Sequence, residues 1–283
     1  FKGNAIVLYA DTPLIKPETV ERVFAALEGG AAVAVLGFEP AEPTAYGRLV
    51  LDAEGNLDRI VEYKDASEAE RAIRLVNSGV LAADATLLFD LLGQVRNENA
   101  NGEYYLTDVV GLARSRGLKA VVVRAGAGEV LGVNSRIDLA EAEAAMQARM
   151  RRDAMNAGVT LVAPETVFFS WDTQIARDVI VEPNVVFGPG VTIGEDAVIH
   201  AFSHLEGATI GEGAHIGPYA RLRPGAEIGA RAKVGNFVEI KKSQLGEGAK
   251  VNHLSHLGDA SVGAGASVGA GASTCNSAGC VGW

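Results

Sequence analysis

Two cationic side chains stand where they could bind one phosphate together. Arg223 follows Leu222 and Lys241 follows Ile240, and both aliphatic residues belong to a series of sites six residues apart. In a coil of three such steps, residues 18 positions apart stack one above the other, at a spacing of about 4.8 Å. Two like charges this close repel each other unless an anion lies between them. The spacing predicts a clamp for a phosphate monoester; the alternative is a solvated pair of charges.

A histidine is placed by the same periodic pattern. His253 lies two residues past the aliphatic site Val251, which stacks it in a column between Asn236 and Ala270. We interpret the remaining histidines as surface or hydrogen-bonded residues, because a lone histidine in a sequence is more often structural than functional. These are His200, His204, His215 and His256.

The element that must position these groups is a periodic stretch in the second half. Its aliphatic or equivalent sites are Val181, Phe187, Ile193, Ile199, Leu205, Ile210, Ile216, Leu222, Ile228, Val234, Ile240, Leu245, Val251, Leu257, Val262, Val268 and Thr274. The step is six residues except at three places, and with the sites labelled A, B and C in rotation all three short steps run from A to B. Because only one corner is shortened, the pattern predicts a triangular β-helix.

Glycine follows many of these sites, which fits a corner that needs a permissive backbone. A low-complexity linker is the alternative explanation for so much glycine and alanine, but a linker would not keep the phase.

Length and composition limit the remaining possibilities. The chain has 283 residues, 48% of them hydrophobic, and a formal net charge of −10. This length suggests two domains, and the acidic balance argues against nucleic-acid binding. The only cysteines, Cys275 and Cys280, indicate no disulfide framework. No apolar run is long enough to span a bilayer and no signal peptide is visible, so we expect a cytoplasmic protein that does not bind membranes.

The first half alternates apolar strands with helices. Strands are predicted at 5–9, 31–36, 47–51, 57–62, 75–81 and 120–123, and helices at 17–27, 86–95 and 106–114. Such alternation favours a mostly parallel, doubly wound sheet. Ligands of these sheets bind beyond the carboxyl ends of the strands, where Asp11 follows the first one. Turns also favour aspartate, so Asp11 alone is weak evidence for a site.

A long helix is predicted where the two halves join. Residues 137–156 are rich in Ala, Glu, Met, Gln and Arg, and Gly158 can end the helix. We therefore divide the chain into residues 1–136, a linker helix at 137–158 and a β-helix domain at 159–283. An ordinary packed helix of the first domain is the alternative. The segment 164–172 is expected to cover the base of the coil.

Six short motifs in the first half keep a consistent order and spacing. They are Tyr9-Ala10-Asp11, Tyr46-Gly47-Arg48, Val61-Glu62-Tyr63-Lys64-Asp65, Asn77-Ser78-Gly79, Gly102-Glu103-Tyr104-Tyr105 and Gly132-Val133-Asn134. Followed by the hexapeptide coil, this series resembles the bacterial bifunctional GlmU family, from about residue 4 to residue 276. In that family an N-acetylglucosamine-1-phosphate uridylyltransferase is fused to a glucosamine-1-phosphate acetyltransferase.

The resemblance implies both the fold and the reactions. The fold is a Rossmann-like, doubly wound α/β nucleotidyltransferase, truncated at its N-terminus, followed by a left-handed parallel β-helix like that of the hexapeptide acyltransferases. The substrates are glucosamine-1-phosphate, acetyl-CoA, UTP and N-acetylglucosamine-1-phosphate. The product, UDP-N-acetylglucosamine, feeds peptidoglycan and lipopolysaccharide synthesis. The family also implies a homotrimer with acetyl-transfer sites between subunits.

The resemblance assigns roles in the first domain to residues within the matched motifs. Asp11 and Asn134 would hold Mg²⁺, which suits two oxygen ligands completed by substrate phosphates. The uracil and N-acetylglucosamine pocket would be lined by Tyr9, Ala10, Gly47, Glu62 and Asn77.

In the coil, the family's phosphate ligands correspond to Arg223 and Lys241, and its catalytic base to His253. The chemistry agrees, because an amine must lose a proton to attack a thioester and neutral imidazole accepts one near pH 7. The remaining positions of the sugar and acetyl-CoA sites correspond to His256, Ser267, Ala270, Asn276 and Ser277. Three of them depart from the family: His256 and Ser277 replace tyrosines, and Ser267 replaces an asparagine.

Two features of the family are missing from the sequence. The glycine-rich turn that cradles nucleotide phosphates would precede residue 1, and the last coils would follow residue 283. We therefore expect this piece to lack full activity. Two other interpretations stay open: a sugar nucleotidyltransferase whose β-helix is not catalytic, and an inert trimerisation module.

Overall fold

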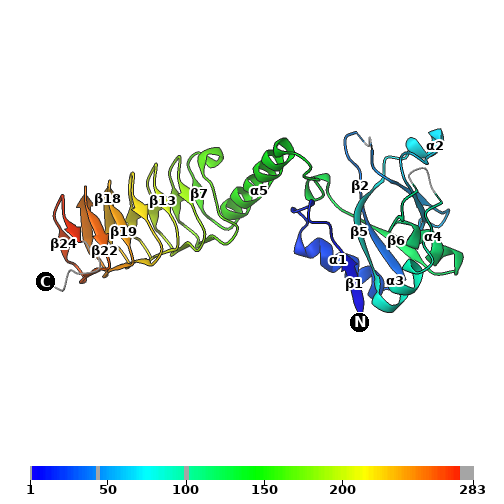
Figure 1. Cartoon of the computed structure of the whole chain (residues 1–283). Helices are drawn as coiled ribbons and strands as arrows, with labels where there is room; N and C mark the ends of the chain where they lie inside the picture. Colours follow the sequence, from blue (N-terminus) through cyan, green and yellow to red (C-terminus); the bar gives the residue numbers. More distant parts are fainter. Residues whose placement is uncertain (1, 43–44, 99–101, 275–283) are drawn as a thin grey trace. The chain divides into compact units, whose positions relative to one another are not determined.

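The computed structural model describes residues 2–42, 45–98 and 102–274, which form two compact units divided between Glu143 and Ala144 (Figure 1). The division falls inside helix α5 (Arg136–Asn156), close to the predicted 137–156. No helix in the described ranges is long and apolar enough to cross a membrane.

The first unit is built on one mixed sheet. Its strands are β1 (Asn4–Val7), β2 (Val33–Phe38), β3 (Arg48–Leu51), β4 (Leu57–Val61), β5 (Val76–Asp84) and β6 (Ala120–Arg124). The order is β4-β3-β5-β2-β6, and β1 pairs with the end of β5. Among the described residues of this sheet only β2 and β6 pair in parallel. The expected mostly parallel sheet is therefore wrong: β5 runs antiparallel to β1, β2 and β3.

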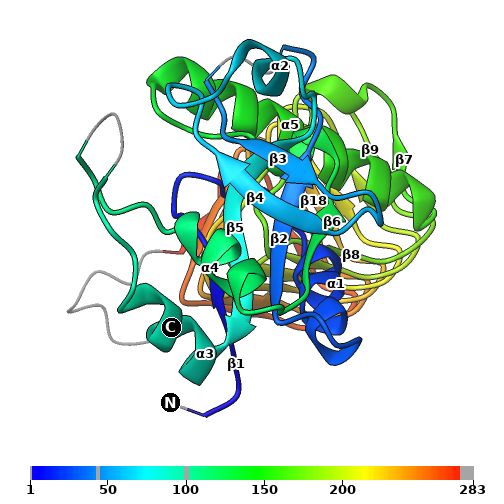
Figure 2. The same cartoon turned by 90° about the vertical axis from the view of Figure 1, so that its right-hand side faces the viewer.

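Helices cover both faces of this sheet, as a doubly wound architecture requires. They are α1 (Pro17–Glu28), α2 (Glu68–Arg71), α3 (Ala85–Leu92), α4 (Asp108–Ser115) and a 3₁₀ turn η1 (Ala127–Glu129). Figures 1 and 2 show α1 on one face and α3 with α4 on the other. Alternate residues of β2 serve the two faces: Val35 packs with α3 and α4, whereas Leu36 packs with α1. Sequence reasoning missed α2, whose Ser67 and Glu70 form a capping box.

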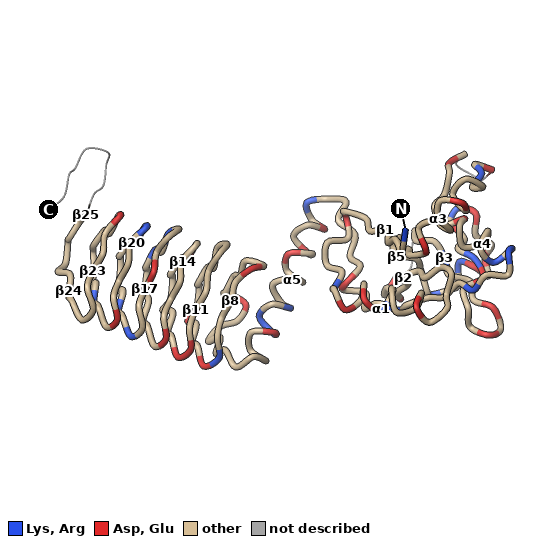
Figure 3. The backbone as a smooth tube through the Cα atoms, turned by 90° about the horizontal axis from the view of Figure 1, so that it is seen from below, with Lys and Arg blue, Asp and Glu red and all other residues tan. Residues whose placement is uncertain are grey.

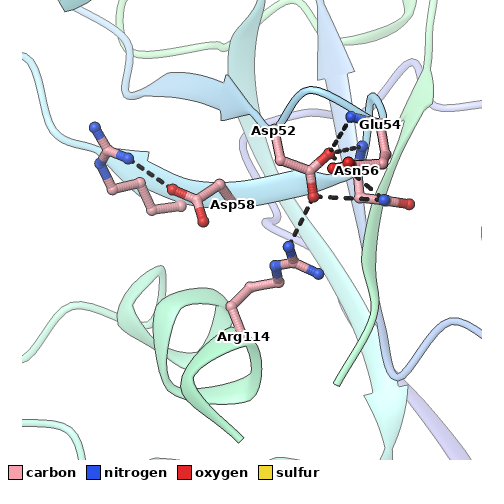
Figure 4. A network of polar contacts seen from close by, with 6 residues as sticks. Asp52, Glu54, Asn56, Asp58 and Arg114 are labelled. Atoms are coloured by element: carbon pink, nitrogen blue, oxygen red, sulfur yellow. Dashed lines mark hydrogen bonds and ion pairs between the residues drawn. The ribbon is translucent and has the colours of Figure 1, made fainter. Parts of the chain in front are cut away.

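A carboxylate ties the β3–β4 hairpin to helix α4 (Figure 4). One oxygen of Asp52 accepts the backbone N–H of Asn56 at 2.8 Å and that of Glu54 at 3.1 Å, which fixes the turn. The other oxygen accepts a guanidinium N–H of Arg114 at 2.7 Å. Both partners are largely shielded from solvent, so this ion pair holds α4 against the hairpin.

The second unit is a parallel β-solenoid with three faces, each a parallel sheet. Sheet A contains β10 (Val186–Phe187), β13 (His204–Leu205), β16 (Arg221–Leu222), β19 (Glu239–Lys241), β22 (His256–Gly258) and β25 (Ser273–Thr274). Sheet B contains β8 (Gln174–Ile175), β11 (Thr192–Ile193), β14 (Ala208–Ile210), β17 (Ala226–Ile228), β20 (Ser243–Leu245) and β23 (Ser261–Val262). Sheet C contains β7 (Thr160–Leu161), β9 (Ile180–Val181), β12 (Val198–Ile199), β15 (His215–Ile216), β18 (Lys233–Asn236), β21 (Lys250–His253) and β24 (Ser267–Val268).

The predicted phase of the coil is confirmed site by site. Leu205 pairs with Leu222, and Leu222 with Ile240, all on sheet A, while sheets B and C hold the other two series. The aliphatic side chains from Val181 to Leu257 point inward and form one buried column, against which the partly buried Val262 and Val268 pack. The segment 164–172 contributes to this base, because Phe168 bridges to Val186 and Phe169 stacks on Phe187 with ring centroids 5.2 Å apart.

The reason for the corner glycines differs from the expected one. Of the glycines that follow aliphatic sites, Gly217 has a positive φ, but Gly211, Gly229 and Gly246 do not. A Cβ on these three would lie only 2.5–2.7 Å from the backbone of the next coil. Close approach of stacked coils therefore explains them, rather than a left-handed backbone. Acidic positions gather along one edge of the solenoid (Figure 3). Ion pairs also join adjacent coils: Arg177 pairs with Glu195, and Arg231 with Glu247.

Candidate functional sites

The first unit contains a cleft of about 410 Å³ at the end of the sheet. Its lining residues are Tyr9, Tyr46, Gly47, Glu62, Asn77, Ser78, Gly79, Tyr104, Tyr105, Leu106 and Thr107. Four of the five predicted pocket residues therefore meet in one cleft, although they come from separate strands and loops. The fifth, Ala10, lies in the turn next to Tyr9 and does not line the cleft.

Backbone hydrogen bonds and a glycine shape one wall of this cleft. The N–H of Asn77 donates to the carbonyl of Gly47 at 2.8 Å, and the N–H of Gly79 donates to Asn77 Oδ1 at 3.0 Å. Gly79 has a φ of +90°, and a Cβ there would lie 2.2 Å from the ring of Tyr9. Only glycine permits both this backbone and this contact, so Gly79 lets the Tyr9 ring form the wall.

The carboxyl group of Glu62 has an environment that sequence reasoning did not foresee. Burial raises its pKa, and the charges of Asp65 and Asp108 raise it further, whereas a hydrogen bond from Thr107 lowers it. The hydroxyl of Thr107 donates to Glu62 Oε1 at 3.1 Å. Thr107 precedes helix α4 at the N-cap position but makes no side-chain cap bond. A threonine hydroxyl at the N-cap normally accepts a backbone N–H of the helix. Here the hydroxyl binds Glu62 instead, which marks Glu62 as part of a functional site.

The predicted metal ligands are brought to the same edge of the unit. The backbone N–H of Val133 donates to the carbonyl of Asp11 at 2.8 Å, which sets Asn134 beside the aspartate loop. Both side chains are exposed, and neither has a side-chain hydrogen bond or ion pair within the described ranges. A carboxylate and an amide oxygen open to solvent fit a hard cation that keeps most of its waters. The residues therefore suit Mg²⁺.

In the second unit the structure places Arg223 and Lys241 on adjacent coils, as predicted. Arg223 directly follows β16, and Lys241 ends β19 at the same corner, between sheets A and B. The two cations are not alone, because Arg223 Nη1 lies 2.8 Å from Glu239 Oε1. Hydrogen bonding to Arg223 lowers the pKa of Glu239, so the carboxylate stays ionised. The repulsion argued from sequence is thus partly relieved within the chain itself.

His253 lies at another corner of the same coils. It ends β21, between sheets C and A, and pairs in register with Asn236 as predicted. The turn is fixed from inside, because the buried Ser255 hydroxyl contacts the carbonyls of His253 at 3.1 Å and Gly269 at 3.2 Å. The imidazole itself is exposed.

The remaining predicted residues of the sugar and acetyl-CoA sites do not share one face. His256 stands on sheet A opposite Glu239, between the His253 corner and the Lys241 corner. Ser267 stands on sheet C, opposite Lys250. Ala270 lies in the exposed turn after β24. Asn276, Ser277 and the two cysteines lie outside the described residues. Sheet A therefore carries His256 between the His253 corner and the Arg223–Lys241 corner, whereas Ser267 and Ala270 lie off this face.

These features define a class: a mixed α/β sheet domain followed by a parallel β-solenoid of hexapeptide repeats. The family described as "Bacterial transferase hexapeptide (six repeats)" matches residues 172–207 and 207–242. Over nearly its whole length the chain is similar to proteins named "Bifunctional protein GlmU". That of Maricaulis maris (strain MCS10) is 74% identical over 274 residues, which is 97% of this chain and 61% of the relative.

Two further relatives carry the same name. The protein of Azorhizobium caulinodans is 59% identical over 96% of this chain and 61% of its own length. That of Zymomonas mobilis subsp. mobilis is 55% identical over 98% of this chain and 62% of its own length. The chain therefore spans about three fifths of the length of the relatives that it matches.

Solved structures give weaker likenesses. The acetyltransferase domain of PglB from Neisseria gonorrhoeae FA1090, in complex with acetyl coenzyme A, is 15% identical, with a TM-score of 0.37. This match covers 52% of the present chain and 67% of that one. A CMP:2-keto-3-deoxy-manno-octonic acid synthetase complexed with CTP is 20% identical, with a TM-score of 0.36 over 53% of this chain and 62% of that one.

Proposed function

We propose that this chain carries parts of two active sites for UDP-N-acetylglucosamine synthesis. The solenoid would transfer an acetyl group from acetyl-CoA to glucosamine-1-phosphate. The first unit would then transfer uridylyl from UTP to N-acetylglucosamine-1-phosphate. The strongest support for this proposal is the similarity to bifunctional GlmU proteins, which extends over at least 96% of this chain at 55–74% identity in three relatives. The clustering of Tyr9, Gly47, Glu62 and Asn77 in one cleft supports it.

In the first unit, these side chains would bind and orient the sugar. Glu62 accepts hydrogen bonds from sugar hydroxyls, and Asn77 offers both a donor and an acceptor. The Tyr9 ring, packed on Gly79, closes one wall of the cleft. Asp11 and Asn134 would hold Mg²⁺, which supplies positive charge to the nucleotide phosphates. Because little covalent chemistry falls to the protein in phosphoryl transfer, positioning is the main contribution of these residues.

In the solenoid, Arg223 and Lys241 would bind the phosphate of glucosamine-1-phosphate. His253 would take a proton from the sugar amine as its nitrogen attacks the thioester carbonyl of acetyl-CoA. The C–S bond then breaks, and the coenzyme leaves as the thiolate, which takes up a proton. A general base of this kind contributes about 10²–10⁴-fold to the rate.

We propose a homotrimer as the working assembly. A column of large apolar side chains supports this proposal: Phe202, Tyr219, Phe237 and Leu254 occupy one corner and are 46–61% exposed. Adjacent rings in the column stack, with centroids 4.9 and 5.1 Å apart. An apolar ridge along the coil axis, next to His253, is costly in water and is suited to burial against identical copies.

Two calorimetric titrations test the proposal on the chain as it exists. The first uses UDP-N-acetylglucosamine with the wild type and Glu62→Ala, and the second uses glucosamine-1-phosphate with the wild type and Arg223→Ala. Each variant should lose only its own ligand. If the wild type binds neither ligand, the chain is a scaffold. If it binds only the nucleotide sugar, the solenoid is not catalytic.

A further inference from the structure

Three polar side chains on successive coils form a chain of contacts at the end of sheet C. Glu182 follows β9, His200 follows β12 and His215 begins β15, and these three strands are neighbours in the sheet. Sequence alone does not associate the two histidines, because 15 residues separate them. The solenoid brings them together by stacking the coils in register.

The carboxylate fixes the orientation of the first imidazole. His200 Nδ1 lies 3.0 Å from Glu182 Oε1, and Glu182 Oε2 accepts the backbone N–H of Ala201 at 2.9 Å. With both oxygens engaged, the carboxylate holds the proton on Nδ1 and leaves Nε2 of His200 with its lone pair. That atom faces Nδ1 of His215 at 3.4 Å. Two ring nitrogens from different coils thus lie within reach of one ion, in rings whose planes are inclined by 29° to each other.

The spacing of these two nitrogens matches shared metal ligation. Two histidine nitrogens about 2.0–2.1 Å from one tetrahedral ion are about 3.3 Å apart. A histidine that binds a metal almost always donates its other ring N–H to a carboxylate or carbonyl, as His200 does to Glu182. A hydrogen bond between two imidazoles would be shorter than 3.4 Å, since N–H donors typically lie 2.9–3.0 Å from the acceptor.

We propose that His200 Nε2 and His215 Nδ1 together bind one divalent transition-metal ion such as Zn²⁺, with Glu182 as the carboxylate that orients His200. Imidazole suits such ions, whereas Mg²⁺ prefers oxygen ligands. No group of three or more His, Cys, Asp or Glu in the described ranges is arranged to hold a metal. The described part of the chain thus supplies two ligands, and water fills the other positions. This site is separate from the sheet A groups of the proposed acetyl transfer and does not depend on that function.

One neighbouring charge opposes the ion and provides a test. Lys233 is paired with His215 in the next coil of sheet C, and its ammonium repels positive charge at the imidazole. Removing that positive charge should tighten metal binding, whereas it should do nothing for a histidine pair that merely stacks. Glu182 acts in the other direction, because removing it frees the His200 ring to turn.

The experiment is calorimetric titration of the EDTA-treated, dialysed chain with ZnCl₂ alone, in a buffer that does not bind zinc. We expect one ion per chain. His215→Ala and His215→Asn should each weaken binding at least tenfold, Glu182→Gln should weaken it about tenfold, and Lys233→Gln should tighten it. His204→Ala, on sheet A, is the matched control and should bind like the wild type. Circular dichroism melts confirm that each variant is folded.

Any of three results would overturn the proposal. The first is a wild type that shows no saturable uptake of Zn²⁺, and the second is that both His215 variants fold and bind as tightly as the wild type. The third is that His204→Ala loses as much binding as the His215 variants do, which would place the ion elsewhere. Co²⁺ provides a second readout, because a change in its visible absorption on binding must disappear in the His215 variants.

Discussion

The hydroxyl of Thr107 donates to Oε1 of Glu62 at 3.1 Å, across a gap of 45 residues in the sequence. Helix α4 carries this threonine at its start, and the Asp52–Arg114 ion pair holds α4 against the β3–β4 hairpin whose second strand leads to Glu62. The orientation of the carboxylate therefore depends on the docking of a helix. Thr107 is a positioning residue rather than a catalytic one in the proposed uridylyl transfer.

Replacing Thr107 by valine should weaken binding of UDP-N-acetylglucosamine by roughly tenfold, because one hydrogen bond to a charged group is lost. Since that bond lowers the pKa of Glu62, its removal should move the pH dependence of binding upward. Thr107→Ser keeps the hydroxyl and should restore both the affinity and the pH profile. Titration calorimetry at several pH values decides this. Equal behaviour of the valine and serine variants would contradict the positioning role.

The buried carboxylate of Glu62 should also lower the stability of the folded chain at neutral pH. Burial raises its pKa, so the unfolded chain loses this proton at a lower pH than the folded one does. Stability therefore falls as pH rises through the unfolded pKa of about 4.5 toward the folded value. Glu62→Gln should melt at a higher temperature than the wild type at pH 7, and the difference should shrink below pH 4.5. A variant that is less stable at pH 7 would show that the carboxylate is net stabilising.

The solenoid could be predicted from sequence almost residue by residue. A coil repeats one local rule, so the phase of Leu205, Leu222 and Ile240 also fixes which residues stack. The alignment of Asn236 with His253 follows from the same count. Counting residues along the repeat could not predict the side-chain contacts between coils. The ion pair of Arg223 with Glu239 and the contact of His200 with His215 depend on rotamers and join residues 15 or 16 positions apart.

The first unit was less predictable, because strand order and direction are set by tertiary packing. Apolar runs located β1 to β6 within a few residues, but the alternation of strands and helices suggested parallel pairing. The long strand β5 runs antiparallel to three of its neighbours instead. Of the cleft residues, Gly79 lay inside a recognised motif, and Thr107 lay in the predicted helix 106–114. Their roles became visible only through a missing cap bond and a close contact with Tyr9.

Gly79→Ala should weaken ligand binding in the cleft as well as strain the backbone. A residue other than glycine with positive φ costs about 1–2 kcal/mol, and here the added methyl would also displace the Tyr9 ring. Gly55→Ala is the matched control, because Gly55 has a φ of +81° with open space around its Cβ position. Both variants should lose stability in thermal melts, but only Gly79→Ala should lose affinity for UDP-N-acetylglucosamine. Equal affinities in the two variants would remove Tyr9 from the binding wall.

Glu239→Gln should strengthen phosphate binding at the solenoid corner. The carboxylate competes with a bound phosphate for Arg223, which it contacts at 2.8 Å, so its removal frees the guanidinium. An exposed ion pair of this kind is worth up to about 1 kcal/mol, which corresponds to roughly a two- to fivefold gain in affinity for glucosamine-1-phosphate. Glu227→Gln on sheet B serves as the control. Weaker binding by Glu239→Gln would mean that the carboxylate holds Arg223 in its binding position.

Phe237→Glu should separate the proposed trimer into monomers. Phe237 stacks on Tyr219 in the exposed corner column and is itself 55% exposed, so a charge there costs little in an isolated chain. In an assembly that buries the column against other copies, the same carboxylate would lose its water without a partner, which costs several kcal/mol. Phe89→Glu, in helix α3, changes a phenylalanine that is 59% exposed and controls for the general effect of added charge. Sedimentation at micromolar concentration should show trimers for the wild type and the control, and monomers for Phe237→Glu. A trimer that survives this change would place the column outside the contact between copies, and a monomeric wild type would remove the trimer itself.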